Sequence, residues 1–506
     1  MEFRLNILKV YSFYFGFIVS ILLRFAPSRY VLSLFKRMNL DARSVWEYER
    51  LNFLLSKRKC KMLFVSLYYF FSPVGKGLTW SCSMESTYRI YNLLFANYIN
   101  TNFRVEKYII KEANFIKNNL ELHSNNNHIL FNYIGLVISD ELYGGGGNYH
   151  RLLYSEIKKQ FNNDGTNFEA STSYHVLVVE SILWLIYFFP HLKNELLKQF
   201  NYTGAIRFIL SVKTEFGIYN VGDNDGSVCI NTQIDNPFLS TIKSKRTVQL
   251  YNINHIIRAF DIDDIDDIDD IDDIDDIDVF NDFGLVSIRN ENYKLLLFNT
   301  NIGQAGKGGH NHNDLLSLCL SYNGREFIID PGVFLYSVDR DKQRSITKHS
   351  SLFACLNGEA LEPELFLNRF GVSNQTKKRV LRRNQDIEAS YSLPTSFDDL
   401  TLCRTINYSL NEIVITDSLL IERGFISGLQ LRSNLFFSDT VVAKKISNNE
   451  VLLCNGIERV LLIFDSSCTI EISYSSISSD YNKFATSQFL NVSTNEREFK
   501  WSIKLI

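Results

Sequence analysis

The stretch that most constrains the fold is residues 308–336, GGHNHNDLLSLCLSYNGREFIIDPGVFLY. Apolar residues alternate with small polar residues over 316–322, which is the period-two pattern of a strand with one buried face. The Asn-Gly pair at 323–324 is a strong signal for a hairpin turn. A return strand then ends at the Asp-Pro-Gly turn at 330–332. The sequence therefore predicts a β-hairpin that brings its last residues back to the level at which it begins.

Two histidines stand at the start of this hairpin and an acid stands at its end. Side chains two residues apart on an extended strand share one face, so His310 and His312 point the same way. With Asp330 they make a candidate ligand set for a divalent metal ion, and zinc suits imidazole and carboxylate ligands. His349 offers a third nitrogen ligand. From spacing alone, two surface histidines beside an ordinary turn are the more common arrangement, and both interpretations stay open.

The overall charge hides an uneven distribution along the chain. The formal net charge is −3, but residues 261–278 contain twelve aspartates, and removing those negative charges leaves +9. A mildly basic remainder suits an anionic partner such as an acidic glycan. Nucleic acid is disfavoured as a partner because the sequence has no basic run interleaved with aromatic residues.

The eight cysteines are scattered and form no C-x-x-C motif. Several lie in apolar runs that resemble strands. This pattern predicts small buried side chains, and it disfavours both a disulfide framework and a thiolate metal site.

The chain divides into four segments. Residues 1–40 contain an apolar run at 10–23, which is short for a membrane span; it fits a signal-peptide core, a membrane anchor or a helix buried on the main domain. Membrane association through this run and a bacterial periplasmic or cell-envelope location are therefore hypotheses. Residues 41–260 show helical periods, and we expect amphipathic helices around 176–189 and 192–208.

The other two segments differ sharply in pattern. Residues 261–279 carry an Ile-Asp-Asp repeat whose period of three matches neither helix nor strand, and its like charges repel, so we expect an extended linker. Residues 280–506 contain regularly spaced short strands, which predict an antiparallel β-sandwich. The predicted fold class is a multidomain α+β protein.

Three places in the helical segment carry polar residues of interest. Trp80, Glu85 and Arg89 align along one side of a helix, although their spacing alone favours an ordinary amphipathic helix. Asn127 and His128 follow two further asparagines, a pattern typical of a helix N-cap. Tyr174 precedes a strongly apolar helix, where an aromatic residue has no special meaning by itself.

Taken together, these motifs resemble the heparinase II/III-like polysaccharide lyases, which include heparin and heparan lyases and oligoalginate lyases. The resemblance rests on G-H-x-H-x-D at 309–314, on N-G-R, on D-P-G with a following Tyr, and on R-S-x-x-x-H at 344–349. A D-G-x-x-x-E-x-S-x-x-Y-H motif at 164–175 agrees with it. Ala170 stands where this family often has glycine, and Ser-Ser follows His349 where Asn-Thr is usual. The resemblance covers roughly residues 75 to 500.

The resemblance implies an (α/α) toroid of helical hairpins followed by an antiparallel β-sandwich. It also implies β-elimination at a 4-linked uronic acid of an acidic polysaccharide or oligosaccharide. Such a reaction needs a group that neutralises the uronate carboxylate, a base for the C5 proton and an acid for the departing O4. Asn127 takes the first task and Tyr174 acts as acid and base. His128 or His310 is an alternative base, and Tyr336 completes the cleft.

The remaining assignments follow from the same resemblance. The predicted substrate-binding residues are Trp80, Glu85, Arg89, Glu169 and Arg344. A mainly structural zinc ion is assigned to His312, Asp330 and His349. Asp223 and Asp225, in a G-D-x-D turn, are expected to support the cleft.

Two other classes of function remain open. A zinc-dependent hydrolase would use His310, His312 and Asp330 around a metal-bound water. A non-catalytic glycan-binding or assembly protein would keep the fold without the reaction. The glycan, endo or exo action and the oligomeric state do not follow from the sequence.

Overall fold

The structure is a computed structural model that describes most of the chain from residue 46 onward. The described residues are 46, 50–55, 61–72, 74–75, 80–99, 104–124, 126–214, 217–231, 245–259, 276–306, 310–312, 314–334, 352–361, 364–366, 372–374, 377–383, 386–394, 399–421, 426–481 and 483–506. The predicted N-terminal segment 1–40 lies outside them. So do three predicted site residues, Tyr336, Arg344 and His349.

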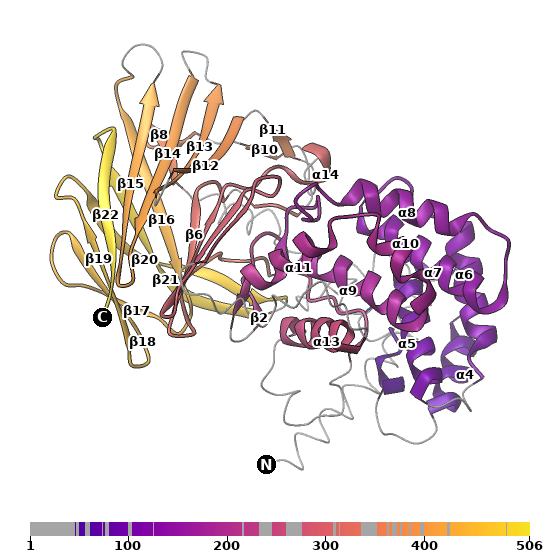
Figure 1. Cartoon of the computed structure of the whole chain (residues 1–506). Coiled ribbons are helices and arrows are strands. Elements are labelled where there is room, and N and C mark those ends of the chain that lie inside the picture. The colour runs from indigo at the N-terminus through magenta and orange to yellow at the C-terminus, as the bar shows by residue number, and fades with distance from the viewer. Residues whose placement is uncertain are drawn as a thin grey trace.

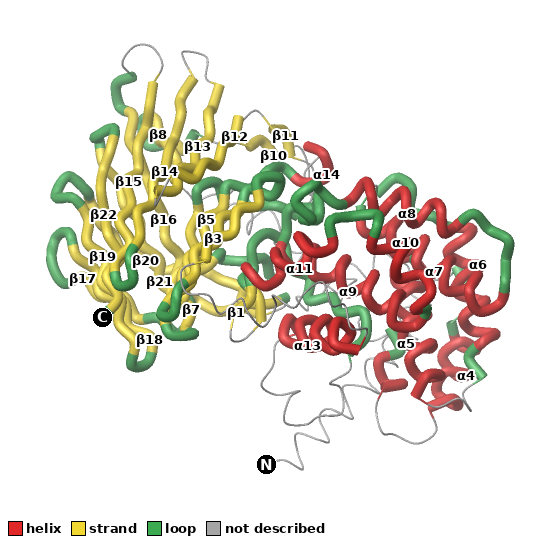
Figure 2. Tube along the Cα trace, viewed as in Figure 1, coloured by secondary structure: helices red, strands yellow, loops and turns green. Residues whose placement is uncertain are grey.

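Helices occupy the first half of the described chain (Figures 1 and 2). They are η1 (Asn52–Leu55), α4 (Lys61–Phe71), α5 (Met84–Ile99), α6 (Glu106–Asn118), α7 (Asn127–Tyr143), α8 (Tyr149–Gln160), α9 (Thr172–Phe188), η3 (Pro190–Leu192), α10 (Lys193–Leu197), α11 (Tyr202–Ser211) and α13 (Lys245–Ala259). Helix α5 packs on α6 and α7, and α9 packs on α7, α11 and α13. Closure of these helices into a toroid stays a prediction.

The amphipathic expectation for residues 176–189 is wrong. Every side chain from Thr172 to Ile186 of α9 is buried, because neighbouring helices surround α9. The expected helix over 192–208 is interrupted, since Asn201 caps α11 by accepting a hydrogen bond from the Gly204 N–H at 2.9 Å. Among the described helices, none is long and apolar enough by itself to span a membrane; α9 and residues 190–197 pass that test only as a pair bent by 120°.

Two large sheets form the second half of the chain (Figure 2). One sheet has the order β20-β21-β16-β7-β6-β5-β4-β3, with β8 beside β16 and β9 beside β8. Its strands are β3 (Asp276–Phe280), β4 (Leu285–Arg289), β5 (Tyr293–Phe298), β6 (Ser317–Tyr322), β7 (Arg325–Ile329), β8 (Leu352–Leu356), β9 (Glu359–Ala360), β16 (Leu429–Phe437), β20 (Thr469–Asp480) and β21 (Lys483–Thr494). The short helix α14 (Gly303–Gly306) lies between β5 and β6 in the chain.

The other large sheet has the order β12-β13-β14-β15-β22-β19-β18-β17. Its strands are β12 (Lys377–Arg383), β13 (Asp386–Pro394), β14 (Asp399–Tyr408), β15 (Glu412–Ile421), β17 (Val442–Lys445), β18 (Glu450–Asn455), β19 (Glu458–Phe464) and β22 (Glu498–Leu505). Two small hairpins complete the strands, β1 (Lys213–Thr214) with β2 (Gly217–Ile218) and β10 (Glu364–Phe366) with β11 (Val372–Asn374). The two large antiparallel sheets are consistent with the predicted sandwich.

The sheet that contains β6 lies between the helices and the other large sheet (Figure 1). Leu296 and Phe298 of β5 belong to the hydrophobic core shared with the helices. Leu295 and Leu297, which alternate with them, belong to the core shared with the second sheet. The central strands are therefore buried on both faces, whereas the sequence pattern of residues 316–322 predicted one buried face. The apolar residues on the two faces of β5 therefore belong to two different cores.

The predicted hairpin is confirmed as β6 and β7. Asn323 and Gly324 have φ angles of 46° and 74°, the left-handed conformation that a two-residue type I′ turn requires. The predicted linker ends earlier than 279, because β3 begins at Asp276. Ile277 is buried, and Asp278 accepts hydrogen bonds from Arg207 and Ser211 of α11. These contacts draw the last repeat unit into the sheet, while residues 261–275 lie outside the described chain.

Candidate active site

The candidate site lies where the helical half meets the loop that precedes β6. A backbone hydrogen bond joins them, from the Asp223 N–H to the His310 carbonyl at 2.7 Å. Gly222 permits this approach: its φ is 76°, and a Cβ atom there would lie 2.6 Å from the same carbonyl oxygen. Only glycine adopts this conformation without strain and leaves room for the contact.

Asp223 connects the two histidines of the H-x-H motif. One carboxylate oxygen lies 3.1 Å from His310 Nδ1, and the other lies 3.3 Å from His312 Nε2. The Nδ1 atom of His312 in turn lies 3.0 Å from an Asp330 carboxylate oxygen. All four side chains are buried. The structure therefore brings the predicted supporting acid, both histidines and Asp330 into one connected polar network.

Tyr174 lies directly against His310. The two rings are stacked, with centroids 3.7 Å apart and planes 11° apart. Tyr174 is in the first turn of α9, and the N-cap residue Ser171 accepts a hydrogen bond from its N–H. The Ser171 hydroxyl donates to the Asp223 carbonyl at 2.7 Å, so the helix cap fixes Tyr174 relative to the acid that holds His310.

Glu169 connects His310 to the start of α7. One of its carboxylate oxygens lies 3.3 Å from His310 Nε2, and the other accepts a hydrogen bond from the Asn127 N–H at 2.6 Å. Burial raises the pKa of Glu169, although the charges of His310 and His128 and the Asn127 N–H act in the opposite direction. A carboxyl group with a raised pKa between two candidate catalytic residues is typical of a functional site.

Asn127 has a buried side-chain oxygen atom, Oδ1, that accepts no hydrogen bond from the described residues. Leaving such an atom unsatisfied costs about 1–3 kcal/mol, so its presence calls for an explanation. A ligand that pairs with the amide would supply one.

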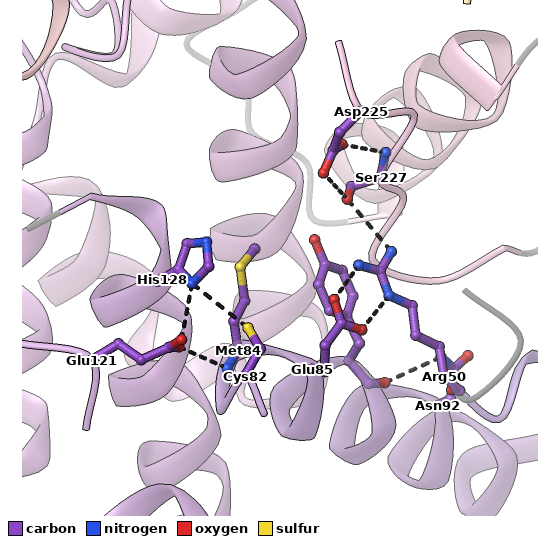
Figure 3. A network of polar contacts seen from close by, with 10 residues as sticks. Arg50, Cys82, Met84, Glu85, Asn92, Glu121, His128, Asp225 and Ser227 are labelled. Atoms are coloured by element: carbon purple, nitrogen blue, oxygen red, sulfur yellow. Dashed lines mark hydrogen bonds and ion pairs between the residues drawn. The ribbon is translucent and has the colours of Figure 1, made fainter. Parts of the chain in front are cut away.

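His128 follows Asn127 but faces different neighbours (Figure 3). Its Nδ1 lies 3.2 Å from Glu121 and 3.6 Å from Cys82 Sγ. Burial acts to lower the pKa of His128, but the contacts with Cys82 and Glu121 outweigh it and raise the pKa well above the usual value. About a third of the His128 side chain is exposed. No sequence motif singled out Glu121, and Cys82 was expected to be only a small buried side chain.

The predicted substrate-binding residues of α5 are engaged inside the protein. Arg89 pairs with Glu112 at 2.8 and 2.9 Å and lies over the Trp80 ring. Glu85 pairs with Arg50 at 2.6 and 2.7 Å. All of these side chains are buried. The structure therefore shows them in buried contacts within the helical half of the chain, and their binding of substrate stays a prediction.

The second of these ion pairs extends toward the G-D-x-D turn (Figure 3). Arg50 also donates to the Ser227 hydroxyl at 3.4 Å, and that hydroxyl donates to Asp225 at 2.9 Å. Asp225 thus lies in a polar chain that runs from α5 to the loop carrying Asp223.

The residues present fit the zinc ion that the resemblance implies. Two ligand atoms of one tetrahedral zinc ion lie roughly 3.3 Å apart, and His312 Nδ1 and Asp330 are 3.0 Å apart. The other His312 nitrogen faces Asp223, the arrangement in which a carboxylate orients a metal-bound imidazole. The third predicted ligand, His349, lies outside the described chain, and zinc binding stays a prediction.

Residues 275–504 match the family described as "Heparinase II/III-like, C-terminal". A crystal structure of heparinase III is 13% identical with a TM-score of 0.65, over 92% of this chain and 76% of that chain. A heparan sulfate lyase from Pedobacter heparinus is 16% identical with a TM-score of 0.57, over the same shares. A heparinase III gene product is 12% identical with a TM-score of 0.57, over 92% and 79%.

No curated protein sequence matched the chain. The resemblance noted from the sequence motifs is nevertheless confirmed, by the family match over the second half of the chain and by the shared fold over most of its length.

Proposed function

We propose that this chain, whose residues 275–504 match the heparinase II/III-like C-terminal family, is a polysaccharide lyase that cleaves a uronic-acid-containing glycan by β-elimination. The solved structures that share its fold are named heparinase III and heparan sulfate lyase, which supports a lyase over other classes of glycan-active protein. The substrate class is an acidic polysaccharide or oligosaccharide. A role in bacterial surface polysaccharide metabolism belongs to the same hypothesis.

The observation that carries the proposal is the stacked pair of Tyr174 and His310. Both side chains are groups that can transfer protons, and the ring of His310 is held by acids on two sides. A phenol and an imidazole fixed side by side can provide the base and the acid that the two ends of an elimination need. Asn127 reaches this pair through Glu169 and has an unsatisfied amide oxygen.

The chemistry assigns one task to each group. The base removes the C5 proton, the electrons of that bond form the C4–C5 double bond, and the C4–O4 bond breaks as the acid protonates O4. Negative charge builds on the uronate carboxylate during this step, so a fixed donor there lowers the barrier. The Asn127 amide can present its NH₂ group in place of its oxygen by rotating half a turn. Tyr174 then serves as acid and base, with His310 as the alternative base.

Zinc in this proposal is a structural ion. Bound by His312 and Asp330 with His349, it would supply a fixed crosslink between the loop before β6 and the turn after β7. Asp223 would keep His312 in the orientation that leaves Nδ1 for the metal, while its second oxygen holds His310.

The geometry favours a lyase over a zinc hydrolase. A hydrolase would need His310 to converge with His312 and Asp330 on one ion. The two ring nitrogens of His310 instead face Asp223 and Glu169, and its ring face lies on Tyr174.

The test is the ultraviolet absorbance of a C4–C5 unsaturated uronate, measured with heparan, hyaluronan, chondroitin, alginate and bacterial surface glycans. We expect one of these to give the absorbance, and we expect Tyr174→Phe and Asn127→Ala each to reduce the rate by at least about 100-fold, the usual contribution of a positioned acid–base or oxyanion-type group. Tyr154→Phe, in α8, is the matched control and keeps full activity. Binding of a glycan without any product would contradict the proposal and favour a binding or assembly protein.

A further inference from the structure

A second cluster of metal-ligating side chains lies at the N-terminal ends of α5 and α7 (Figure 3). It consists of Cys82, Glu121 and His128, whose sulfur, oxygen and nitrogen atoms lie within 4.8 Å of one another. The Cys82 Sγ to His128 Nδ1 distance is 3.6 Å, and the distance from that nitrogen to Glu121 Oε1 is 3.2 Å. None of the predictions made from the sequence treats these three side chains as one site.

The distances match those that one tetrahedral ion imposes on its ligands. Zinc bonds of about 2.3 Å to sulfur and about 2.0–2.1 Å to nitrogen and oxygen place a sulfur and a nitrogen ligand roughly 3.6 Å apart, and a nitrogen and an oxygen ligand roughly 3.3 Å apart. The observed separations of 3.6 and 3.2 Å agree with both values. The three atoms are therefore arranged with room for one shared ion.

The positions of Cys82 and Glu121 around His128 also disfavour a role for Cys82 as a catalytic nucleophile. In a nucleophile–histidine–acid triad, the nucleophile and the acid contact opposite nitrogens of the imidazole. Here Cys82 and Glu121 both contact Nδ1 of His128. Convergence on one nitrogen is what a shared ion requires, and a proton relay through the ring is not possible in this arrangement.

Neighbouring groups hold the acid of this cluster in place. The second carboxylate oxygen of Glu121 accepts hydrogen bonds from the Met84 N–H at 3.0 Å and from the Asn132 amide at 3.4 Å. Asn132 also accepts a hydrogen bond from the Glu121 N–H at 2.9 Å. Outer contacts of this kind fix a ligand before the metal arrives and raise its affinity.

The histidine is fixed by the cap of α7. The Asn126 side chain accepts a hydrogen bond from the His128 N–H at 3.1 Å. Cys82 is buried two residues before the start of α5, so two of the ligands come from helix ends and the third from the loop between α6 and α7.

We propose that Cys82, Glu121 and His128 bind a transition-metal ion of the zinc class, at a site separate from His312 and Asp330. A thiolate ligand selects zinc, cobalt or a related ion over magnesium and calcium. Three protein ligands leave a fourth position open, and the exposed third of His128 gives that position access to solvent. Binding replaces the thiol proton of Cys82 and the Nδ1 proton of the His128 ring with the metal, so the ion competes with protons for the site.

Such an ion would add positive charge next to Asn127. If the proposed lyase function holds, that charge would favour an acidic sugar near the helix end. The metal site itself does not depend on the lyase function, because its test contains no glycan.

The experiment is a Co²⁺ titration of the full chain after treatment with a chelator, followed by near-ultraviolet absorbance. A cobalt–thiolate bond gives an intense charge-transfer band, whereas a site built from imidazole and carboxylate does not. We expect the band to appear as Co²⁺ is added, to saturate with one equivalent in the His312→Ala background, which lacks the other proposed metal site, and to disappear when excess Zn²⁺ is added. It should be lost in Cys82→Ser and kept in Cys454→Ser, which removes a thiol of the β-sandwich. It should also be kept in His312→Ala.

Two results would overturn the proposal: cobalt binding without a charge-transfer band, or a band that survives in Cys82→Ser. If Cys82→Ser fails to fold, Glu121→Gln tests the metal site instead, since it keeps the thiol and the neighbouring hydrogen bonds. The proposal requires this variant to bind Co²⁺ at least about tenfold more weakly. Unchanged affinity would exclude Glu121 as a ligand and overturn the three-residue site.

Discussion

At the scale of single residues, the hydrogen bonds of a buried titratable side chain determine its protonation state in the folded protein. His175, beside the candidate acid–base residue Tyr174, shows this most clearly. Its Nδ1 accepts a hydrogen bond from the Asn167 N–H at 3.0 Å, and its Nε2 donates to the Ala205 carbonyl at 3.0 Å. Only the neutral ring can do both. Burial accordingly lowers the pKa of His175 to about 4.

This arrangement predicts a loss of stability in mild acid. The unfolded chain binds a proton at His175 below pH 6.5 and the folded chain does so only near pH 4, so the free energy of unfolding falls as the pH drops through that window. From pH 7 to pH 5 we expect His175 to account for about 2 kcal/mol. Urea unfolding of the wild-type chain and of His175→Gln at both pH values measures it. Equal pH dependence in the two proteins would contradict the prediction.

Contacts between site residues that are far apart in the sequence could not be predicted. His310, His312 and Asp330 were candidates because they lie in one short motif. Their shared partner Asp223 was expected to support the cleft, but its contacts with both rings span 87 and 89 residues of chain and depend on tertiary packing. Cys82 was missed for the same reason, since it lies 46 residues before His128 and meets it only when α5 and α7 pack together. Glu121 lies only seven residues before His128, but it stands in the loop before α7, where no sequence pattern predicted the contact.

At the scale of elements, patterns that depend on neighbours in the chain were the most predictable. The β6–β7 hairpin follows from its alternation and its Asn-Gly turn, and both local signals agree with the fold. Burial of α9 on all sides was not predictable from its period, because it depends on the helices packed around it.

A buried arginine ties the second sheet to the loop before β6. Arg404 of β14 pairs with Asp417 of β15 at 2.6 Å and donates to the Leu316 carbonyl at 2.6 Å. Leu316 has a φ of 59°, so the loop turns in a strained conformation where this bond holds it. The contact connects the β-sandwich core to the segment that carries His310 and His312.

Removing the contacts of Arg404 should lower the stability of the folded protein. Arg404→Met leaves the buried Asp417 carboxylate with the Trp501 N–H but without the charge that balances it, so we expect the free energy of unfolding to fall by about 3–5 kcal/mol. The control is Lys504→Met, which removes an exposed pair with Glu412 at 3.7 Å and should change stability by less than about 1 kcal/mol. Denaturant unfolding of both variants gives the comparison. Similar small losses in the two would show that Arg404 is not an anchor.

At the scale of the whole molecule, one sheet serves two cores. The sequence predicted a helical part and a strand-rich part on either side of the acidic repeat. It did not predict that β4 to β6 would face the helices on one side and the second sheet on the other. This arrangement places the loop before β6 against α9 and the G-D-x-D turn, so the candidate site exists only when both halves are folded together.

A substitution at Gly222 tests whether the candidate site depends on the contact between the helical half and the strand-rich half, since Gly222 lies at this contact. In Gly222→Ala the new methyl group would lie 2.6 Å from the His310 carbonyl, so the loop carrying His310 must move. A displacement of about 1 Å in a catalytic group can cost on the order of 100-fold in rate, and we expect a loss of this size in lyase activity. Gly146→Ala is the control, because its φ of 62° is similar and nothing lies within 4 Å of the added atom. Equal activity in the two variants would contradict the prediction.

The central claim is that the bond is broken by elimination, and the mass of the products tests it most directly. Mass spectrometry of a defined uronic-acid oligosaccharide, before and after exposure to the purified chain, compares the summed fragment masses with the mass of the substrate. Elimination adds no water, so we predict that the two fragments sum to the intact substrate. Fragments that sum to the substrate plus one water would identify a hydrolase and contradict the roles assigned to Tyr174 and His310.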